Sequence, residues 1–211
     1  MIVIVGLLIL VLELSFTTDS SSDIFSGELT YQILNNDSPQ FRQWVGNSPS
    51  RLDQKERYLN TSKKITINKD TIIIERFDSY GELYMLSIQY GNNIFTNSGS
   101  QDDIYNSDFA DVSNFKYEMN AVKSWKKIDE NYFRGFNNST VLEIEIDPNK
   151  RYNIPNRSLG GFSEVFHKKR LIKYQSRMFR EDVRETTLVS IEEKSVNCKE
   201  LMWKYDFRVK D

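Results

Sequence analysis

His167 and Cys198 are the only histidine and the only cysteine in the chain. They are therefore the only pair that could combine a thiol nucleophile with an imidazole base. Such chemistry also needs a third group that orients the base, and the sequence around neither residue indicates one. We interpret His167 as a surface residue in a basic loop and Cys198 as a small semi-buried residue of the C-terminal tail. The sequence predicts a protein that is not an enzyme.

Three carboxylates, Glu143, Glu145 and Asp147, alternate with apolar residues, which places them on one face of a strand. Such a row could bind calcium or supply an acid and a base. More often it is the solvated face of a half-exposed strand, where basic cross-strand neighbours offset the repulsion. We adopt that interpretation. With one cysteine and one histidine the ligands for zinc are missing, so we predict no metal and no cofactor.

A basic stretch with interleaved aromatic residues follows His167. Cations and aromatic rings in this arrangement could meet phosphate, lipid headgroups or nucleic acid. Acidic residues at 181, 182 and 185 dilute the stretch, and an exposed, salt-bridged strand explains it more simply. Lys plus Arg at 28 against Asp plus Glu at 30 leaves a net charge of −2, so we expect no nucleic-acid partner. The basic surface contact, if one exists, is predicted at Lys168, Lys169, Arg170, Lys173 and Arg177.

The chain begins with an almost uninterrupted apolar run, Met1–Leu12, followed by the polar stretch Thr17–Asp23. A dozen apolar residues match the core of a signal peptide better than a membrane span, which needs about 20. The run has no basic residue before it and no small-x-small cleavage site after it. We predict that residues 1–22 are a signal peptide or a retained N-terminal anchor with its linker, through which the protein could associate with a membrane. Residues 23–211 are predicted to form a single β-rich domain, exported to the periplasm or outer envelope.

Strand signals dominate the remainder of the chain. Leu29, Tyr31 and Ile33 alternate with polar residues, which is typical of a half-buried strand. Further strands are predicted at 65–67, 71–77, 82–90, 94–96, 141–147, 171–176 and 186–193. Short polar or glycine-containing gaps separate the first of these, so we expect hairpins and antiparallel pairing.

Two helices are expected beside these strands. Ser38 is a predicted helix cap with Pro39 at the first helical position, so a short helix should follow the first strand. Phe109, Val112, Met119 and Val122 recur at helical spacing, so a second helix is predicted over 107–127. A sheet with one apolar face needs a cover, and this second helix is the expected cover.

Three segments carry a resemblance to a known family: FSGELTYQI, KKITINKDTIIIERFDSYGELYMLSIQYGNNIF and TTLVSIEEKSVNCKELMWKYDF. In this order they resemble exported bacterial envelope domains related in fold to the outer-membrane lipoprotein carriers. The resemblance implies an α+β, mainly β fold, in which a curved antiparallel sheet (a half-barrel) wraps around one or two helices. It also implies an apolar groove, which in the carriers holds acyl chains.

Together, residues and resemblance predict a non-enzymatic envelope protein that binds a lipid, an acyl chain or a hydrophobic peptide. The alternative is a structural or interaction module that docks on another envelope protein and has no ligand cavity. A carboxylate-only hydrolase would need two acids converging in a cleft, and the sequence predicts no such convergence. The residues expected to line the groove or fill the core are Tyr31, Tyr84, Leu86, Tyr90, Phe109 and Trp125.

Overall fold

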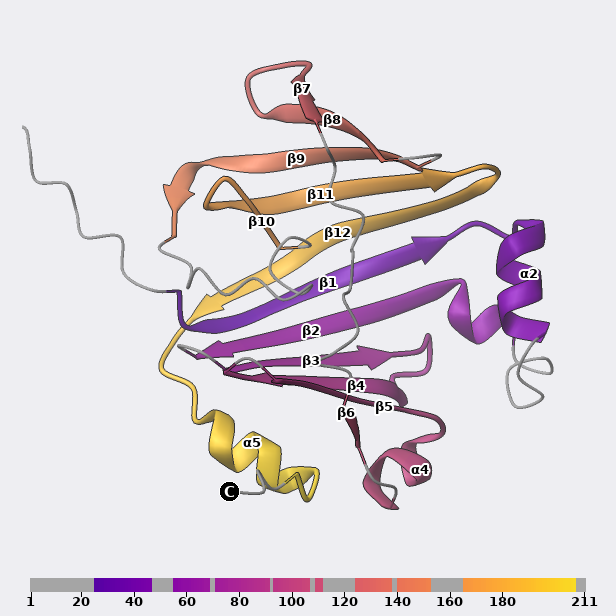
Figure 1. Cartoon of the computed structure of the whole chain (residues 1–211), viewed down its shortest axis with the longest axis vertical. Coiled ribbons are helices and arrows are strands. Elements are labelled where there is room, and N and C mark those ends of the chain that lie inside the picture. The colour runs from indigo at the N-terminus through magenta and orange to yellow at the C-terminus, as the bar shows by residue number, and fades with distance from the viewer. Residues whose placement is uncertain are drawn as a thin grey trace, which may run out of the picture.

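The computed structural model of the chain describes residues 25–46, 55–68, 71–91, 93–106, 109–111, 124–137, 140–152 and 165–207. Within them, one antiparallel sheet of twelve strands organises the molecule (Figure 1). The predicted leader, residues 1–22, lies outside the described residues. None of the helices in the described part is long and apolar enough to cross a membrane.

The sheet consists of two meanders that meet in its middle. The first contains β1 (Gly27–Asn35), β2 (Asn60–Asn68), β3 (Thr71–Phe77), β4 (Leu83–Tyr90), β5 (Asn93–Ser98) and β6 (Ala110–Asp111). The second contains β7 (Ser124–Lys127), β8 (Tyr132–Asn137), β9 (Thr140–Arg151), β11 (Arg170–Phe179) and β12 (Asp182–Glu193), and the short β10 (Phe166–His167) pairs with β11. The strand order is β6-β5-β4-β3-β2-β1-β12-β11-β9-β8-β7, so the pairing of β1 with β12 joins the two meanders.

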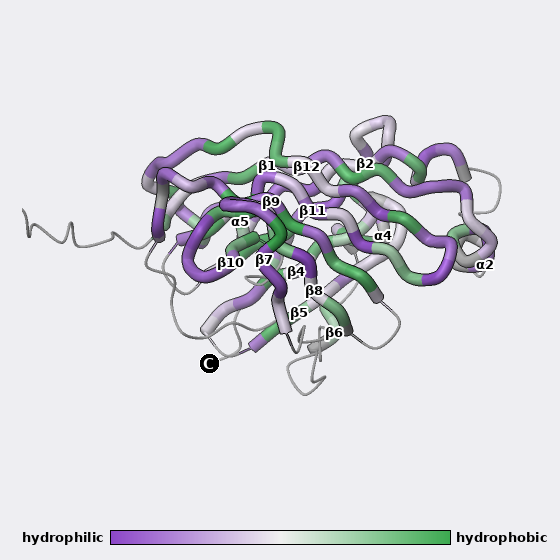
Figure 2. Tube along the Cα trace, turned by 90° about the horizontal axis from the view of Figure 1, so that it is seen from above, coloured by the Kyte–Doolittle hydropathy of each residue, from purple (hydrophilic) through white to green (hydrophobic). Residues whose placement is uncertain are grey.

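The sheet is curved and open, with β6 and β7 at its two edges. Figure 2 shows it as an arch in which β1, β2 and β12 form the crest, while β5, β6 and β8 lie at the lower ends. This confirms the predicted fold class: α+β, mainly β, with a curved antiparallel sheet and few helices. The predicted strands over 65–67, 71–77 and 186–193 are confirmed within β2, β3 and β12.

The concave face carries a core at the end of the sheet where β1 begins. Leu29, Ile65 and Ile67 are almost completely buried there. The rings of Phe25 and Tyr152 meet edge to face with their centroids 5.0 Å apart and cover this end together with Phe166. Apolar residues that alternate along three adjacent strands therefore form one continuous buried layer.

A second core lies on the convex face, beneath the C-terminal helix α5 (Cys198–Lys204). Asn197 caps this helix, because its side chain accepts from the Glu200 amide. The helix and the residues that follow it pack on Ile73, Leu86 and Ile88, none of which is exposed to solvent. Strand β3 is therefore buried on both faces, since Ile72 and Ile73 belong to different cores.

The two helix predictions have different outcomes. Helix α2 (Pro39–Gly46) begins as predicted, and its Phe41 amide donates to Ser38 Oγ at 3.0 Å. The helix predicted over 107–127 is wrong at both ends, because 110–111 and 124–127 are strands β6 and β7; residues 112–123 lie outside the described residues. The predicted helix was expected to cover the sheet, but on the convex face the cover is α5. Helix α4 (Gln101–Asn106) adds Ile104 to the same core.

Candidate ligand-binding site

The predicted groove residues are distributed over both faces of the sheet. Tyr31 is buried in the concave core and donates from its hydroxyl to the Ile172 carbonyl at 3.0 Å. Leu86 and Tyr90 belong to the convex core under α5. The structure therefore does not bring these residues together in one groove.

The remaining three predicted groove residues pack locally. Phe109 meets the ring of Phe207 with centroids 5.2 Å apart, and Trp125 meets the ring of His167 at 4.8 Å. Tyr84 lies edge to face with Tyr58 at 5.4 Å. Each ring therefore packs against a residue distant in sequence, and none of the three is among the described residues that line the two hollows defined below.

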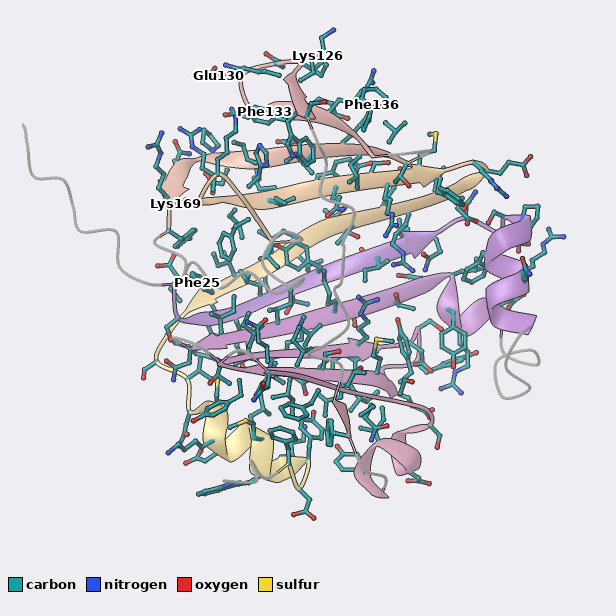
Figure 3. The ribbon with its side chains drawn as sticks, viewed as in Figure 1. Phe25, Lys126, Glu130, Phe133, Phe136 and Lys169 are labelled. Carbon is teal, nitrogen blue, oxygen red and sulfur yellow. The ribbon has the colours of Figure 1, made fainter. Side chains whose placement is uncertain are left out.

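The predicted basic stretch divides into two parts. Lys168 and Lys169 form the turn between β10 and β11 with φ of 49° and 65°, and Lys169 marks that end of the sheet in Figure 3. Arg170 begins β11, and the Lys173 ammonium lies 4.0 Å from Glu145. Arg177 lies towards the other end of β11, directly opposite Arg184 of β12. Of these five residues, Arg177 is the one found among the described residues that line the two hollows defined below.

His167 and Cys198 lie in separate packing clusters, so the structure does not join them into a catalytic pair. Cys198 is buried in the convex core. His167, expected at the surface, is partly buried between the rings of Trp125 and Phe133. Burial and the neighbouring Lys168 charge lower the pKa of His167 from 6.5 to about 4. Its buried Nε2 has no hydrogen-bond partner among the described residues.

The three carboxylates of β9 lie on the face away from the concave core. Glu143 accepts from Tyr132 Oη at 2.5 Å and from Arg134 Nε at 2.6 Å. The hydrogen bond to Glu143, with burial as a smaller cause, raises the pKa of Tyr132 to about 12. Within the described ranges no group of three or more potential ligands is placed to hold a metal ion. Two of the three carboxylates of this outer face form ion pairs, Glu143 with Arg134 and Glu145 with Lys173.

A cleft opens where the end of β1, helix α2 and the β11–β12 hairpin meet. We call it the outer cleft; its volume is about 240 Å³. Asn36 holds the hairpin against β1 through two hydrogen bonds to Val183. The Asn36 backbone N–H donates to the Val183 carbonyl at 3.0 Å, and the Asn36 side-chain Oδ1 accepts from the Val183 backbone N–H at 2.8 Å. The described residues that line the outer cleft are Asn35, Asn36, Phe41, Arg177, Phe179, Asp182, Val183 and Arg184.

A smaller hollow, the inner hollow, lies next to the outer cleft on the concave face. Its volume is about 30 Å³, room for one or two water-sized groups. Arg177 and Arg184 line both spaces, so they form a common wall between them. The described residues that line the inner hollow are Ile33, Lys63, Arg76, Gln175, Arg177, Arg184 and Thr186.

Strand register explains why four cations share this hollow. Lys63 of β2 lies directly opposite Arg76 of β3, and Arg177 of β11 lies directly opposite Arg184 of β12. Lys63 is only 3% exposed, and its ammonium lies 5.1 Å from the centre of the Tyr31 ring. Arg184 Nε donates to Asn35 Oδ1 at 2.9 Å. The inner hollow is therefore strongly cationic, with its charges held on β-strands.

Two charged residues in the phase of the core were a signal for this hollow that sequence reasoning missed. Lys63 is in phase with Ile65 and Ile67 along β2, and Arg76 is in phase with Ile72 along β3. Charged residues on the otherwise apolar face of a strand are uncommon and often functional. Their convergence with β11 and β12 depends on the long-range pairing of β1 with β12, which no local pattern predicts.

Comparisons with known proteins add no assignment. No family model matches the chain, and no curated protein matches it. The resemblance to the lipoprotein carriers and the predicted export therefore stay predictions.

Proposed function

We propose that this chain is a non-enzymatic binding module that holds the hydrophobic part of a small ligand in the outer cleft. The observation that carries the proposal is the cleft itself, about 240 Å³, which three apolar side chains flank: Phe41 of α2, Phe179 of β11 and Val183 of β12. Apolar pockets with a few convergent polar groups are the usual form of small-molecule sites. Asn35, Asn36 and the two arginines supply such polar groups here.

The size of the cleft limits the ligand. Sites for drug-sized molecules usually enclose about 300–1,000 Å³, so the outer cleft matches a short acyl chain, or the end of a longer one. Each buried methylene contributes about 0.8 kcal/mol of binding free energy. A chain of several methylenes would therefore bind measurably, and the same walls would accept an apolar side chain of a peptide.

The proposed setting is the cell envelope, after export. The apolar run Met1–Leu12 supports this part of the proposal, and the curved antiparallel sheet is compatible with a fold like that of the lipoprotein carriers. The proposal differs from the groove predicted by that resemblance, because the cleft lies at the end of the sheet between β1, α2 and the β11–β12 hairpin.

Titration calorimetry of the full chain with 1-octanol tests the proposed cleft. Phe179→Ala removes an apolar wall, and we expect it to weaken binding about tenfold, since truncating a buried aromatic contact costs more than about 1.4 kcal/mol. Phe136→Ala is the matched control, because Phe136 is a β8 phenylalanine that is 52% exposed and does not line the cleft.

Both variants retain residues 1–24, so any binding to the apolar N-terminus affects them equally. Equal affinities in the wild type and both variants would contradict the proposal, and so would the absence of saturable binding.

A second candidate function is docking on another envelope protein. The observation that favours it is a row of apolar side chains across the convex face: Phe136 lies opposite Val141, and Val141 lies opposite Met178. Phe136 is 52% and Met178 is 45% exposed. A photo-crosslinker at position 178 should capture an envelope protein under this alternative, while the outer cleft would bind no octanol.

A further inference from the structure

Two like-charged pairs face each other across the concave sheet surface around the inner hollow. Directly opposed like charges in an antiparallel pair destabilise a sheet, and both Lys63–Arg76 and Arg177–Arg184 are such pairs. The pairs come from opposite sides of β1, with β2 and β3 on one side and β12 and β11 on the other. The charges therefore repel one another within each pair and share a single small space.

Convergence on one hollow requires both the curvature of the sheet and the length of the side chains. Neighbouring strands are about 4.8 Å apart, so Arg76 and Arg177, four strands apart, would stand about 19 Å apart on a flat sheet. Both side chains nevertheless line the same hollow. The curvature of the sheet, seen in the backbone trace of Figure 2, brings their strands closer together than a flat sheet would. A cationic centre so placed is complementary to an anion that enters from the concave side.

The lining residues favour a negatively charged occupant. None of the described residues that line the inner hollow is acidic, whereas Gln175 and Thr186 add neutral hydrogen-bonding groups. In the described part of the chain neither Arg76 nor Arg177 forms an ion pair closer than 4.0 Å. Guanidinium groups bind carboxylate and phosphate through paired N–H donors.

The volume selects among the oxyanions. At about 30 Å³ the hollow has room for one or two water-sized groups, which matches the two oxygens of a carboxylate better than the four oxygens of a phosphate. The shared wall of Arg177 and Arg184 then places the carboxylate beside the apolar outer cleft. The single carboxylate among the described lining residues of that cleft, Asp182, belongs to the outer space only.

We propose that the inner hollow is an oxyanion site that binds the carboxylate of an amphipathic ligand, with Arg76 and Arg177 as its recognition residues. The ligand class is then a short-chain or medium-chain fatty acid, or a molecule that ends in one. This inference rests on the proposed function for the apolar part of the ligand, but the charged part can be tested separately.

The experiment compares octanoate with 1-octanol on the full chain by calorimetry at pH 7.5, where the carboxylic acid is ionised. We expect octanoate to bind about tenfold or more tightly than octanol, because hydrogen bonds to charged groups contribute more than about 1.5 kcal/mol. Arg76→Gln should weaken octanoate binding about tenfold and so abolish this preference, since Arg76 lines the inner hollow. Lys173→Gln, a charge loss at an exposed position of β11, is the matched control and should change neither affinity.

Thermal unfolding without ligand distinguishes a recognition role of Arg76 from a structural role, because the two roles change the melting temperature in opposite directions. Arg76→Gln should raise the melting temperature, because it relieves the repulsion of Lys63 on the neighbouring strand. A lower melting temperature together with weaker binding of both ligands would overturn the assignment of Arg76 as a recognition residue.

The outcomes separate this inference from the proposed function. Equal affinities for octanoate and octanol would overturn the oxyanion site and leave the apolar cleft intact. Binding of inorganic phosphate or acetate without binding of octanol would support the oxyanion site and contradict the cleft. Displacement of octanoate by phosphate would show that the oxyanion site also accepts a free inorganic anion. If none of the four probes bound, both proposals would be overturned.

Discussion

The pKa of the His167 imidazole is set by the aromatic and cationic groups packed around it. The centroid of its ring lies 4.8 Å from that of Trp125 and 5.1 Å from that of Phe133. Burial is the larger cause of its lowered pKa, and the Lys168 charge adds to it. The neutral imidazole is therefore the form that the folded chain accommodates.

His167 should make the fold sensitive to acid. Its pKa is about 4 in the folded chain against 6.5 as the ordinary value, so the unfolded chain binds the extra proton between these values. The contribution to stability is complete above pH 6.5 and decreases as the pH falls towards 4, by about 2.5 kcal/mol at pH 4.5. Urea unfolding at pH 7.5 and pH 4.5 should show this loss in the wild type and a smaller loss in His167→Gln.

Carboxylates also titrate over part of this range, so the variant provides the comparison that isolates the imidazole. An equal loss of unfolding free energy in the wild type and His167→Gln would contradict a buried, neutral imidazole at this position.

One residue of the proposed site, Arg177, also belongs to the basic contact predicted from the sequence. Arg177 lines both hollows. Lys168, Lys169 and Arg170 were expected to join it, but they lie at the opposite end of β11, because residues seven or more positions apart on a strand are separated by more than about 20 Å. The predicted basic contact therefore does not form one continuous surface, although its residues are close together in the sequence.

At the scale of elements, the junction of β1 and β12 decides whether the two meanders form one sheet. Gly27 opens β1 with φ of +153°, a conformation that favours glycine. A Cβ at this position would lie 2.1 Å from the Glu192 backbone oxygen on β12. The close approach of the two strands at this point therefore requires a residue without a side chain.

Gly27→Ala should destabilise the fold by more than about 2 kcal/mol, because it adds a steric clash to the backbone strain. Gly91→Ala is the matched control: Gly91 also has a positive φ, +58°, but a Cβ added there would meet no atom of a non-adjacent described residue within 4 Å. Strain alone should cost this variant about 1 kcal/mol. Equilibrium unfolding in urea measures both, and equal losses would contradict a steric clash at the β1–β12 junction.

The sequence pattern correctly predicted the elements that depend only on residues close together in the chain. The hairpins from β2 to β5 follow from short polar gaps between apolar runs, and Ser38 with Pro39 correctly predicted the start of α2. The helix expected over 107–127 failed at its described ends, where tertiary packing overrides the apolar spacing. Phe109 is held by Phe207, and Trp125 by His167, contacts with elements far along the chain.

At the scale of the whole molecule, the sheet has a core on each of its faces, so alternation of apolar residues along a strand does not show which face holds a ligand site. Ile72 packs in the concave core and Ile73 in the convex core, so the run Thr71–Phe77 does not indicate which face is lined by a ligand site. The assumption of a single apolar face led to a groove composed of residues from both. The curvature that gathers Arg76 and Arg177 is likewise a property of the complete sheet.

Together the two proposals place a small amphipathic ligand where β1 ends beside the β11–β12 hairpin, with its apolar part in the outer cleft and its carboxylate in the inner hollow. NMR chemical-shift mapping of the full chain during titration with octanoate examines that placement residue by residue. We expect saturable shifts in the Asn35 and Asn36 side-chain amides, in the Val183 methyl groups and in the Arg177 Nε–H, all of which line the two hollows. Saturable shifts at Phe136 and Met178 on the convex face with none at these groups, or no shifts at all, would contradict it.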